Sequence, residues 1–226
     1  MTGLRVAPWV VVAACIVFAP AAHAQSPPVP GRFEVGFGTV WIGQAGLGSS
    51  DANETTSGGT TSRLFSSATT VAGNAGIEGR VAVRVTQTLE AEAAASYTHP
   101  PLETAISADT ENNSPVTVTE RLDQFIVGGG VLWYVPRLGL VRLAPFAIGS
   151  IAYLRQLHEG RTLTATGRVV QAGGGVKYTL ASRSSGFFKG FGVRADARLA
   201  VRAKGVAFDD RARYSPALGA SVFVRF

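Results

Sequence analysis

The chain has 226 residues, of which 16% are charged and 27 are glycine, with a formal net charge of +6. A typical soluble domain has about 25% charged residues and about 7% glycine. The mean hydropathy is positive, at +0.20, yet no segment beyond the first 25 residues is a long apolar run. This combination argues against a helical protein and favours β-structure with one apolar face and one small or polar face.

The first 24 residues have the features of a secretory signal peptide. A basic residue precedes an apolar run, Val6 to Pro20, and Ala22-His23-Ala24 forms a small-x-small cleavage site. The run is shorter than the roughly 20 residues that a transmembrane helix needs. Residues 12–15 offer a weaker lipoprotein cleavage box. Cleavage after Ala24 would remove the only cysteine and leave residues 25–226 as one domain without disulfides.

Beyond residue 32 the chain alternates between apolar and small or polar side chains, which is the period of β-strands. The alternation predicts eight strands, at about 32–42, 70–85, 89–98, 117–135, 141–154, 163–180, 188–203 and 213–226. The parity of the fifth strand is ambiguous. The stretches 44–67 and 99–115 are rich in small polar residues and predict long loops, whereas 86–88, 136–139 and 182–186 predict short turns. An even strand number with alternating long and short connections is typical of membrane barrels, which must close on themselves in lipid.

The last predicted strand ends in phenylalanine, and its apolar face resembles the closing strand of bacterial outer-membrane β-barrels. The resemblance implies an assembly signal made of Tyr214, Val222, Val224 and Phe226. The complete pattern resembles the small eight-stranded outer-membrane barrels, a family that includes the OmpA transmembrane domain and an OmpW-like group. It implies an all-β fold, a single eight-stranded antiparallel up-and-down transmembrane barrel over residues 25–226, in the outer membrane of a Gram-negative cell. The partners implied are outer-membrane lipid, lipopolysaccharide and the barrel assembly machinery, with no cofactor, and we expect a monomer.

Charged residues of the predicted strands fall on the face opposite the apolar one. An eight-stranded barrel encloses an interior that side chains roughly fill. Charges placed there must pair, because burying one alone costs several kcal/mol. We therefore predict an ion-paired interior that contains Glu78, Arg80, Arg84, Glu90, Glu92, Lys177, Arg194, Asp196, Arg198 and Arg202.

Other kinds of site are weakly indicated. His99 and His158 lie at predicted loop edges, without the His-x-Ser arrangement of outer-membrane lipid A deacylases. No spacing of Cys, His, Asp and Glu fits a metal site. The glycine runs 128–130 and 173–175 lack the Lys-Ser/Thr of phosphate loops. The basic residues are not interleaved with aromatic ones, which argues against nucleic-acid binding.

These observations favour a non-enzymatic outer-membrane protein with a polar, ion-paired interior and surface-exposed loops, in a structural or surface-interaction role. The alternative is a narrow pore or a barrel that binds or transports a small amphipathic solute. A lipid A-modifying enzyme is less favoured. A soluble secreted barrel would need an apolar interior and a polar exterior, the reverse of the predicted faces.

Overall fold

The computed structural model describes residues 32–55, 57–107, 115–135, 142–158, 164–204 and 212–226. The predicted signal peptide and the predicted turn at 136–139 lie outside these residues. The described residues contain no helix long and apolar enough to cross a membrane. They form eleven strands: β1 (Phe33–Ile42), β2 (Ala45–Thr55), β3 (Thr61–Val71), β4 (Asn74–Arg84), β5 (Leu89–Thr98), β6 (Pro101–Ser107), β7 (Val116–Tyr134), β8 (Leu143–His158), β9 (Thr164–Ser182), β10 (Gly190–Lys204) and β11 (Arg213–Arg225).

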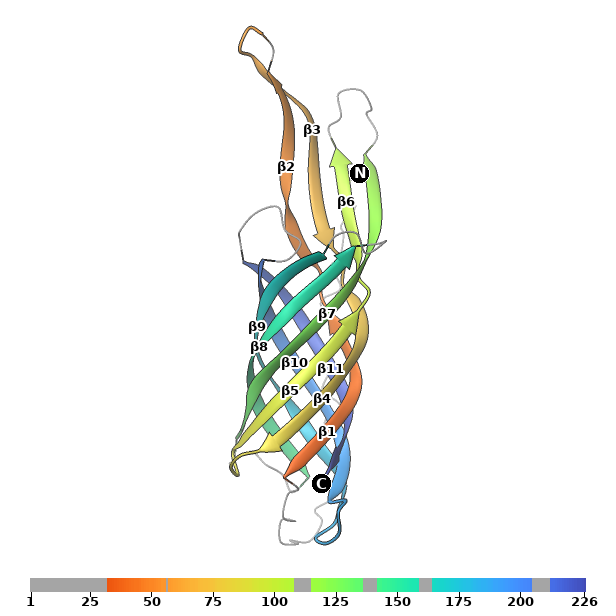
Figure 1. The fold of residues 1–226 in the computed structure, drawn as a ribbon, viewed down its shortest axis with the longest axis vertical. Helices are drawn as coiled ribbons and strands as arrows, with labels where there is room; N and C mark the ends of the chain where they lie inside the picture. Colours follow the sequence, from red (N-terminus) through yellow and green to blue (C-terminus); the bar gives the residue numbers. More distant parts are fainter. Residues whose placement is uncertain (1–31, 56, 108–114, 136–141, 159–163, 205–211) are drawn as a thin grey trace, which may run out of the picture.

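Eight of these strands close into an antiparallel barrel (Figure 1). The ring runs β1-β4-β5-β7-β8-β9-β10-β11 and returns to β1 through a register that extends from Glu34 opposite Arg225 to Ile42 opposite Ala217. Closure pairs the backbone groups of every barrel strand on both sides, as a strand in lipid requires. The predicted eight-stranded barrel is confirmed, and β5 has the predicted bounds.

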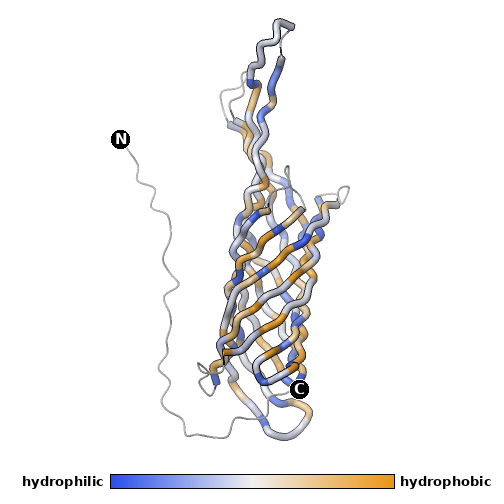
Figure 2. Tube along the Cα trace, turned by 90° about the vertical axis from the view of Figure 1, so that its left-hand side faces the viewer, coloured by the Kyte–Doolittle hydropathy of each residue, from blue (hydrophilic) through white to orange (hydrophobic). Residues whose placement is uncertain are grey.

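The two long polar loops predicted at 44–67 and 99–115 are wrong over much of their length. β2 and β3 form a hairpin that rises above the barrel, and β6 pairs with β3 and with the first part of β7 (Figure 1). We call this sheet of β2, β3, β6 and residues 116–121 the extension. Its strands are mostly exposed and rich in Ser and Thr. Figure 2 shows the protruding hairpin mostly in white and blue, the colours of the less hydrophobic residues. Because water contacts both faces, backbone pairing forms the strands without the apolar alternation that would reveal them in a sequence.

Three short breaks separate the extension from the barrel, and they define its upper end. They lie at residues 43–44, 72–73 and 99–100, between β1 and β2, β3 and β4, and β5 and β6. Backbone hydrogen bonds connect two of these breaks to adjacent segments of the same chain. The N–H of Gly43 donates to the carbonyl of Pro216, and the N–H of Ala72 donates to the carbonyl of Pro101. The lower end of the barrel is where β1 begins and β11 ends (Figure 1).

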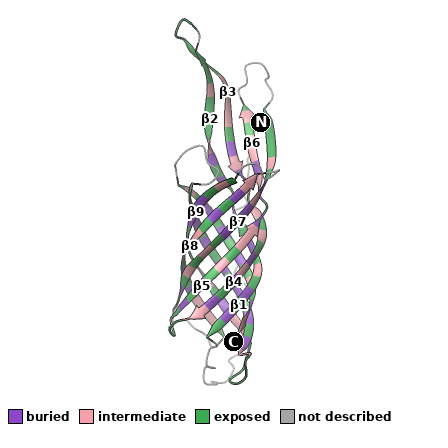
Figure 3. Ribbon diagram, in the orientation of Figure 1, coloured by how far each residue is buried: buried purple, intermediate pink, exposed green. Residues whose placement is uncertain are grey.

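The outside of the barrel is apolar. Burial alternates residue by residue along the barrel strands (Figure 3). Large hydrophobic side chains occupy the exposed positions, for example Phe37 at 58% and Ile151 at 60% exposed. Trp41 marks the upper end of this band on β1 and Phe33 the lower end. At about 3.3 Å per residue and a strand tilt of about 40°, the stretch between them spans about 20 Å, close to the roughly 25 Å band of transmembrane barrels.

Three apolar clusters lie on the inner face of the barrel and at the base of the extension. Residues Leu132, Tyr134, Phe146 and Ile148 form the lower cluster. The upper cluster contains Val40, Ile42, Ile126, Leu154, Val169, Ala200 and Ala217, and the third, at the base of the extension, contains Leu47, Val71, Leu102 and Leu122. The ambiguous parity of the fifth predicted strand is explained here, since β8 carries apolar side chains on its inner face as well as on its outer one.

Candidate functional site: the charged interior

The ten charged residues predicted for the interior lie on the inner face of the barrel. Nine of them are buried, and the side chain of Arg84 is 18% exposed. Several of their ion pairs join strands that are not neighbours in the ring, such as Arg198 of β10 with Glu78 of β4. Such contacts can form only across the lumen, so the charges crosslink opposite walls of the barrel.

Asp196 is the centre of a network in the middle of the lumen. Its carboxylate contacts three guanidinium groups, at 3.0 Å from Arg80 Nη1, 2.9 Å from Arg194 Nε and 2.8 Å from Arg198 Nε. Arg194 also pairs with Glu92, and its guanidinium lies 4.7 Å from the ring centre of Phe146.

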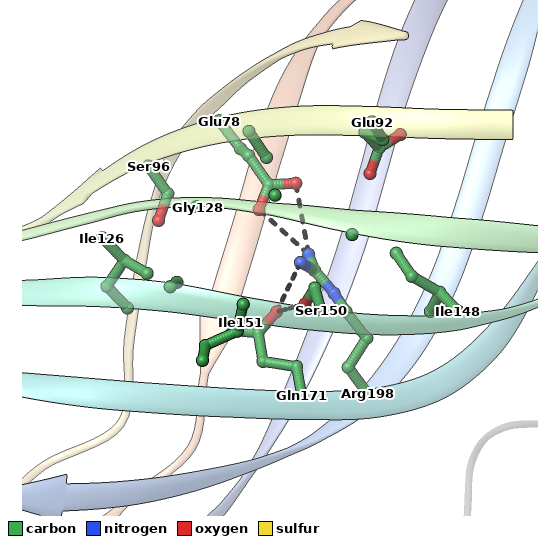
Figure 4. A pocket seen from close by; sticks show the side chains of 14 residues that line it. Glu78, Glu92, Ser96, Ile126, Gly128, Ile148, Ser150, Ile151, Gln171 and Arg198 are labelled. Carbon is green, nitrogen blue, oxygen red and sulfur yellow. Dashed lines mark hydrogen bonds and ion pairs between the residues drawn. The ribbon is translucent and has the colours of Figure 1, made fainter. Parts of the chain in front are cut away.

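Glu78 completes this middle network. It pairs with Arg80 and, through both carboxylate oxygens, with Arg198 Nη2 at 3.0 and 3.2 Å. Arg198 also donates from Nη1 to Gln171 Oε1 at 3.0 Å, as Figure 4 shows. Three carboxylates thus face three guanidinium groups, so the charges of this middle network balance.

Inward-facing glycines make room for these long side chains. A Cβ at Gly219 would lie 2.9 Å from Arg80 Nη2 and 3.0 Å from Asp196 Oδ2. A Cβ at Gly173 would collide with the backbone carbonyl of Ala197 on the adjacent strand. The glycine runs noted in the sequence therefore serve the close approach of strands and charges in a narrow barrel.

A second network lies at the lower end around Lys177, which is fully buried. Its Nζ lies 2.5 Å from Glu34 Oε1 and 2.6 Å from Glu90 Oε1, across the lumen from β9. Glu90 also accepts a hydrogen bond from the Tyr134 hydroxyl at 2.7 Å and lies 3.6 Å from Arg84 Nη2. The ammonium is thus held by two carboxylates, which is the compensation that a buried charge needs.

The partners of these networks that the sequence analysis missed include Glu34, Tyr134, Gln171 and Arg225. Arg225 Nε lies 2.9 Å from Glu34 Oε2 and closes the lower network. The sequence contained a signal for both residues, because each has the inward parity of its strand, and they lie opposite each other at the lower end of the pairing between β1 and β11. Tyr134 and Gln171 are uncharged and gave no comparable signal.

The networks leave little free space. A cavity of about 30 Å³ lies between Glu78, Arg198, Gln171, Ser150 and the inner face of β7 (Figure 4). That volume holds one or two water molecules, since one water needs about 10 to 15 Å³ on the same measure.

The four residues of the expected assembly signal lie on or near the outer surface of β11. Tyr214 and Val222 are 64% and 60% exposed, and Val224 and Phe226 are half-buried. The Phe226 ring centre lies 5.0 Å from that of Phe187, and Phe226 N–H donates to the Phe33 carbonyl at 2.9 Å. Their placement is compatible with lipid contact.

The two histidines of the described residues pair with carboxylates near the upper end of the barrel. His99 Nδ1 lies 2.7 Å from Asp123 Oδ1, which also accepts a hydrogen bond from the Tyr97 hydroxyl at 2.6 Å. His158 Nδ1 lies 3.0 Å from Glu120 Oε1. The described residues contain no group of three or more His, Cys, Asp or Glu side chains that could hold a metal ion.

No family model matches this chain, and no curated protein is similar to it in sequence. Among solved structures, the outer membrane protein OprG from Pseudomonas aeruginosa aligns with 88% of this chain and 97% of its own, at a TM-score of 0.50 and 10% identity. The chain has the fold of the small eight-stranded outer-membrane barrels. Ail, the attachment invasion locus protein of Yersinia pestis, aligns with 86% of this chain and 99% of its own, at a TM-score of 0.38 and 9% identity. At such identities the likeness of this barrel to its neighbours concerns the fold alone.

Proposed function

We propose that this chain is a non-enzymatic integral outer-membrane protein, in which a closed, ion-paired barrel anchors the extension at the cell surface. The observation that carries the proposal is an apolar exterior around an interior crosslinked by buried charges. A soluble barrel would show the opposite arrangement. The proposal includes a monomer surrounded by outer-membrane lipid and lipopolysaccharide.

The orientation follows from the connections. Transmembrane barrels of bacteria place short turns in the periplasm and long connections outside. The lower end holds the short connections 85–88 and 183–189 as well as the C-terminal residue, whereas the upper end carries the extension. We therefore place the extension on the outer side, where its mostly polar, exposed strands are available to partners.

The packed interior supports a closed barrel rather than a narrow pore or a solute-binding barrel. Sites for small organic molecules occupy about 300 to 1,000 Å³, far more than the roughly 30 Å³ cavity found between the walls. The upper cluster draws side chains from β1, β7, β8, β9, β10 and β11, so it spans the lumen above the middle network and would oppose the passage of ions.

The test combines cell fractionation with bilayer recordings of the full chain. We expect the protein in the outer-membrane fraction, with a band that migrates faster on SDS gels when unboiled, and no conductance steps in planar bilayers. Lipid A from cells that express it should keep its mass. A periplasmic protein with one gel mobility would refute the membrane assignment, steady ion conduction would refute closure, and a lipid A mass shift would refute the non-enzymatic role.

A further inference from the structure

Arg202 differs from the other buried arginines because no carboxylate lies beside it in the described residues. It is inward-facing on β10 and 6% exposed, in the same row as Arg194 and Arg198. Those two arginines each contact two carboxylates. The hydrogen bond of Arg202 joins Nη1 to Gln124 Oε1 at 3.2 Å, and its buried Nε has no acceptor. A buried guanidinium in this setting lacks the counter-charge that normally offsets its desolvation.

Among the described residues, the surroundings of Arg202 supply further hydrogen-bond donors and no negative charge. Gln124 Oε1 already accepts a second hydrogen bond, from Gln156 Nε2 at 3.0 Å, and Gln124 Nε2 donates to Thr98 Oγ1 at 3.1 Å. These bonds fix the amide of Gln124 with its oxygen toward the guanidinium. The Arg202 guanidinium therefore has one neutral hydrogen-bond acceptor, Gln124 Oε1, which also accepts from Gln156.

Ser215 provides a second unsatisfied polar group on the neighbouring strand. It is fully buried, and its hydroxyl has no hydrogen-bond partner. Ser215 lies opposite Ala200 in the register of β10 and β11, which makes it a diagonal neighbour of Arg202. Buried polar atoms are almost always hydrogen-bonded, so two such atoms at adjacent positions indicate a missing acceptor.

We propose that this layer, made of Arg202, Ser215 and Gln124, is a binding site for a small monovalent anion in the upper lumen. It lies between the upper cluster and the cluster at the base of the extension. The free Nε–H of the guanidinium and the Ser215 hydroxyl would donate to the anion. A water molecule could accept the same bonds but would leave the charge uncompensated, and this difference selects an anion.

The test compares chloride, acetate and gluconate at equal ionic strength on the full-length barrel refolded in detergent micelles. Chloride and acetate distinguish a halide from a carboxylate, and gluconate serves as the anion too large to enter. We expect one of the small anions to raise the unfolding midpoint in a saturable manner, as binding to the folded state requires. For chloride, the ³⁵Cl NMR line should broaden at least twofold over micelles alone.

Variants distinguish anion binding at this site from the general screening of charges by salt. Arg202→Gln should abolish the anion dependence and be at least as stable as the parent in gluconate, because it removes an uncompensated charge. Ser215→Ala should fold normally and weaken anion binding several-fold, which keeps the test valid if Arg202→Gln fails to fold. Arg63→Gln, at an exposed position of the extension, is the matched control and should keep the full anion effect. Equal midpoints in all three anions, or an unchanged anion effect in Arg202→Gln or Ser215→Ala, would overturn the proposal.

Discussion

Replacing Asp196 by asparagine should destabilise the barrel strongly, although the two side chains have nearly the same shape. The carboxylate contacts three guanidinium groups within 3.0 Å, in a network where three acids balance three arginines. Asp196→Asn leaves that network with one uncompensated positive charge and creates no cavity. Removing one partner of a buried ion pair costs about 3 to 5 kcal/mol.

Urea titration of the refolded protein in lipid vesicles measures this cost, with the heat-shifted gel band and tryptophan fluorescence as two readouts. Asp51→Asn is the matched control, because it makes the same chemical change in an ion pair that is 3.9 Å long and about half exposed. Exposed pairs contribute about 0 to 1 kcal/mol. The double variant Asp196→Asn/Arg198→Gln restores the charge balance and should recover at least about 1 kcal/mol relative to the sum of the single changes.

The reasoning fails if the free energies of unfolding of Asp196→Asn and Asp51→Asn differ by less than about 1 kcal/mol. Such a difference is too small for the loss of a buried ion pair. It also fails if the double variant is merely additive, because the charge balance of the middle network would then carry no energy.

The remaining predictions concern space, the extension and assembly. Gly219→Leu should lower the free energy of unfolding by about 1 to 3 kcal/mol by crowding the middle network, while Gly79→Ala, where a Cβ meets no atom within 4 Å, stays near neutral in the same urea titration. Deleting residues 50–66 should leave the heat-shifted band and change the free energy of unfolding by less than about 1 kcal/mol, because the described residues of this segment include no buried side chain. Loss of the band would show that the barrel does not fold without the hairpin. Phe226→Ala should lower the amount in the outer-membrane fraction several-fold while refolding into detergent is little changed, and equal amounts in cells would argue against its role as an assembly signal.

The sequence was most informative where lipid and lumen impose different side chains on alternate residues. β5 was predicted with its observed bounds because alanines and a tyrosine face outward while Glu90 and Glu92 face inward. β8 was harder, because Phe146, Ile148 and Leu154 are apolar and face inward. The parity rule alone cannot orient a strand whose two faces are equally apolar.

Two parts of the molecule were beyond this kind of prediction. The strands of the extension carry no apolar alternation, and their Gly, Ser, Thr and Asn content is the composition of a loop. The partners of the interior charges depend on which strands face each other across the lumen. A local sequence pattern contains no information about that arrangement. Lys177, for example, meets carboxylates 143 and 87 residues away in the chain.

The three breaks at the upper end give β7 a mechanical role. Of the four strands in the extension, β7 alone continues into the barrel without interruption, from Val116 to Tyr134. A partner that pulls on the extension would load the barrel directly along β7, and along β1, β4 and β5 only through two-residue links. Within the wall β7 is bonded to β5 on one side and β8 on the other, and these bonds lie perpendicular to the strand. A pull along its axis stresses both ladders together in shear, so the force is shared among many bonds at once.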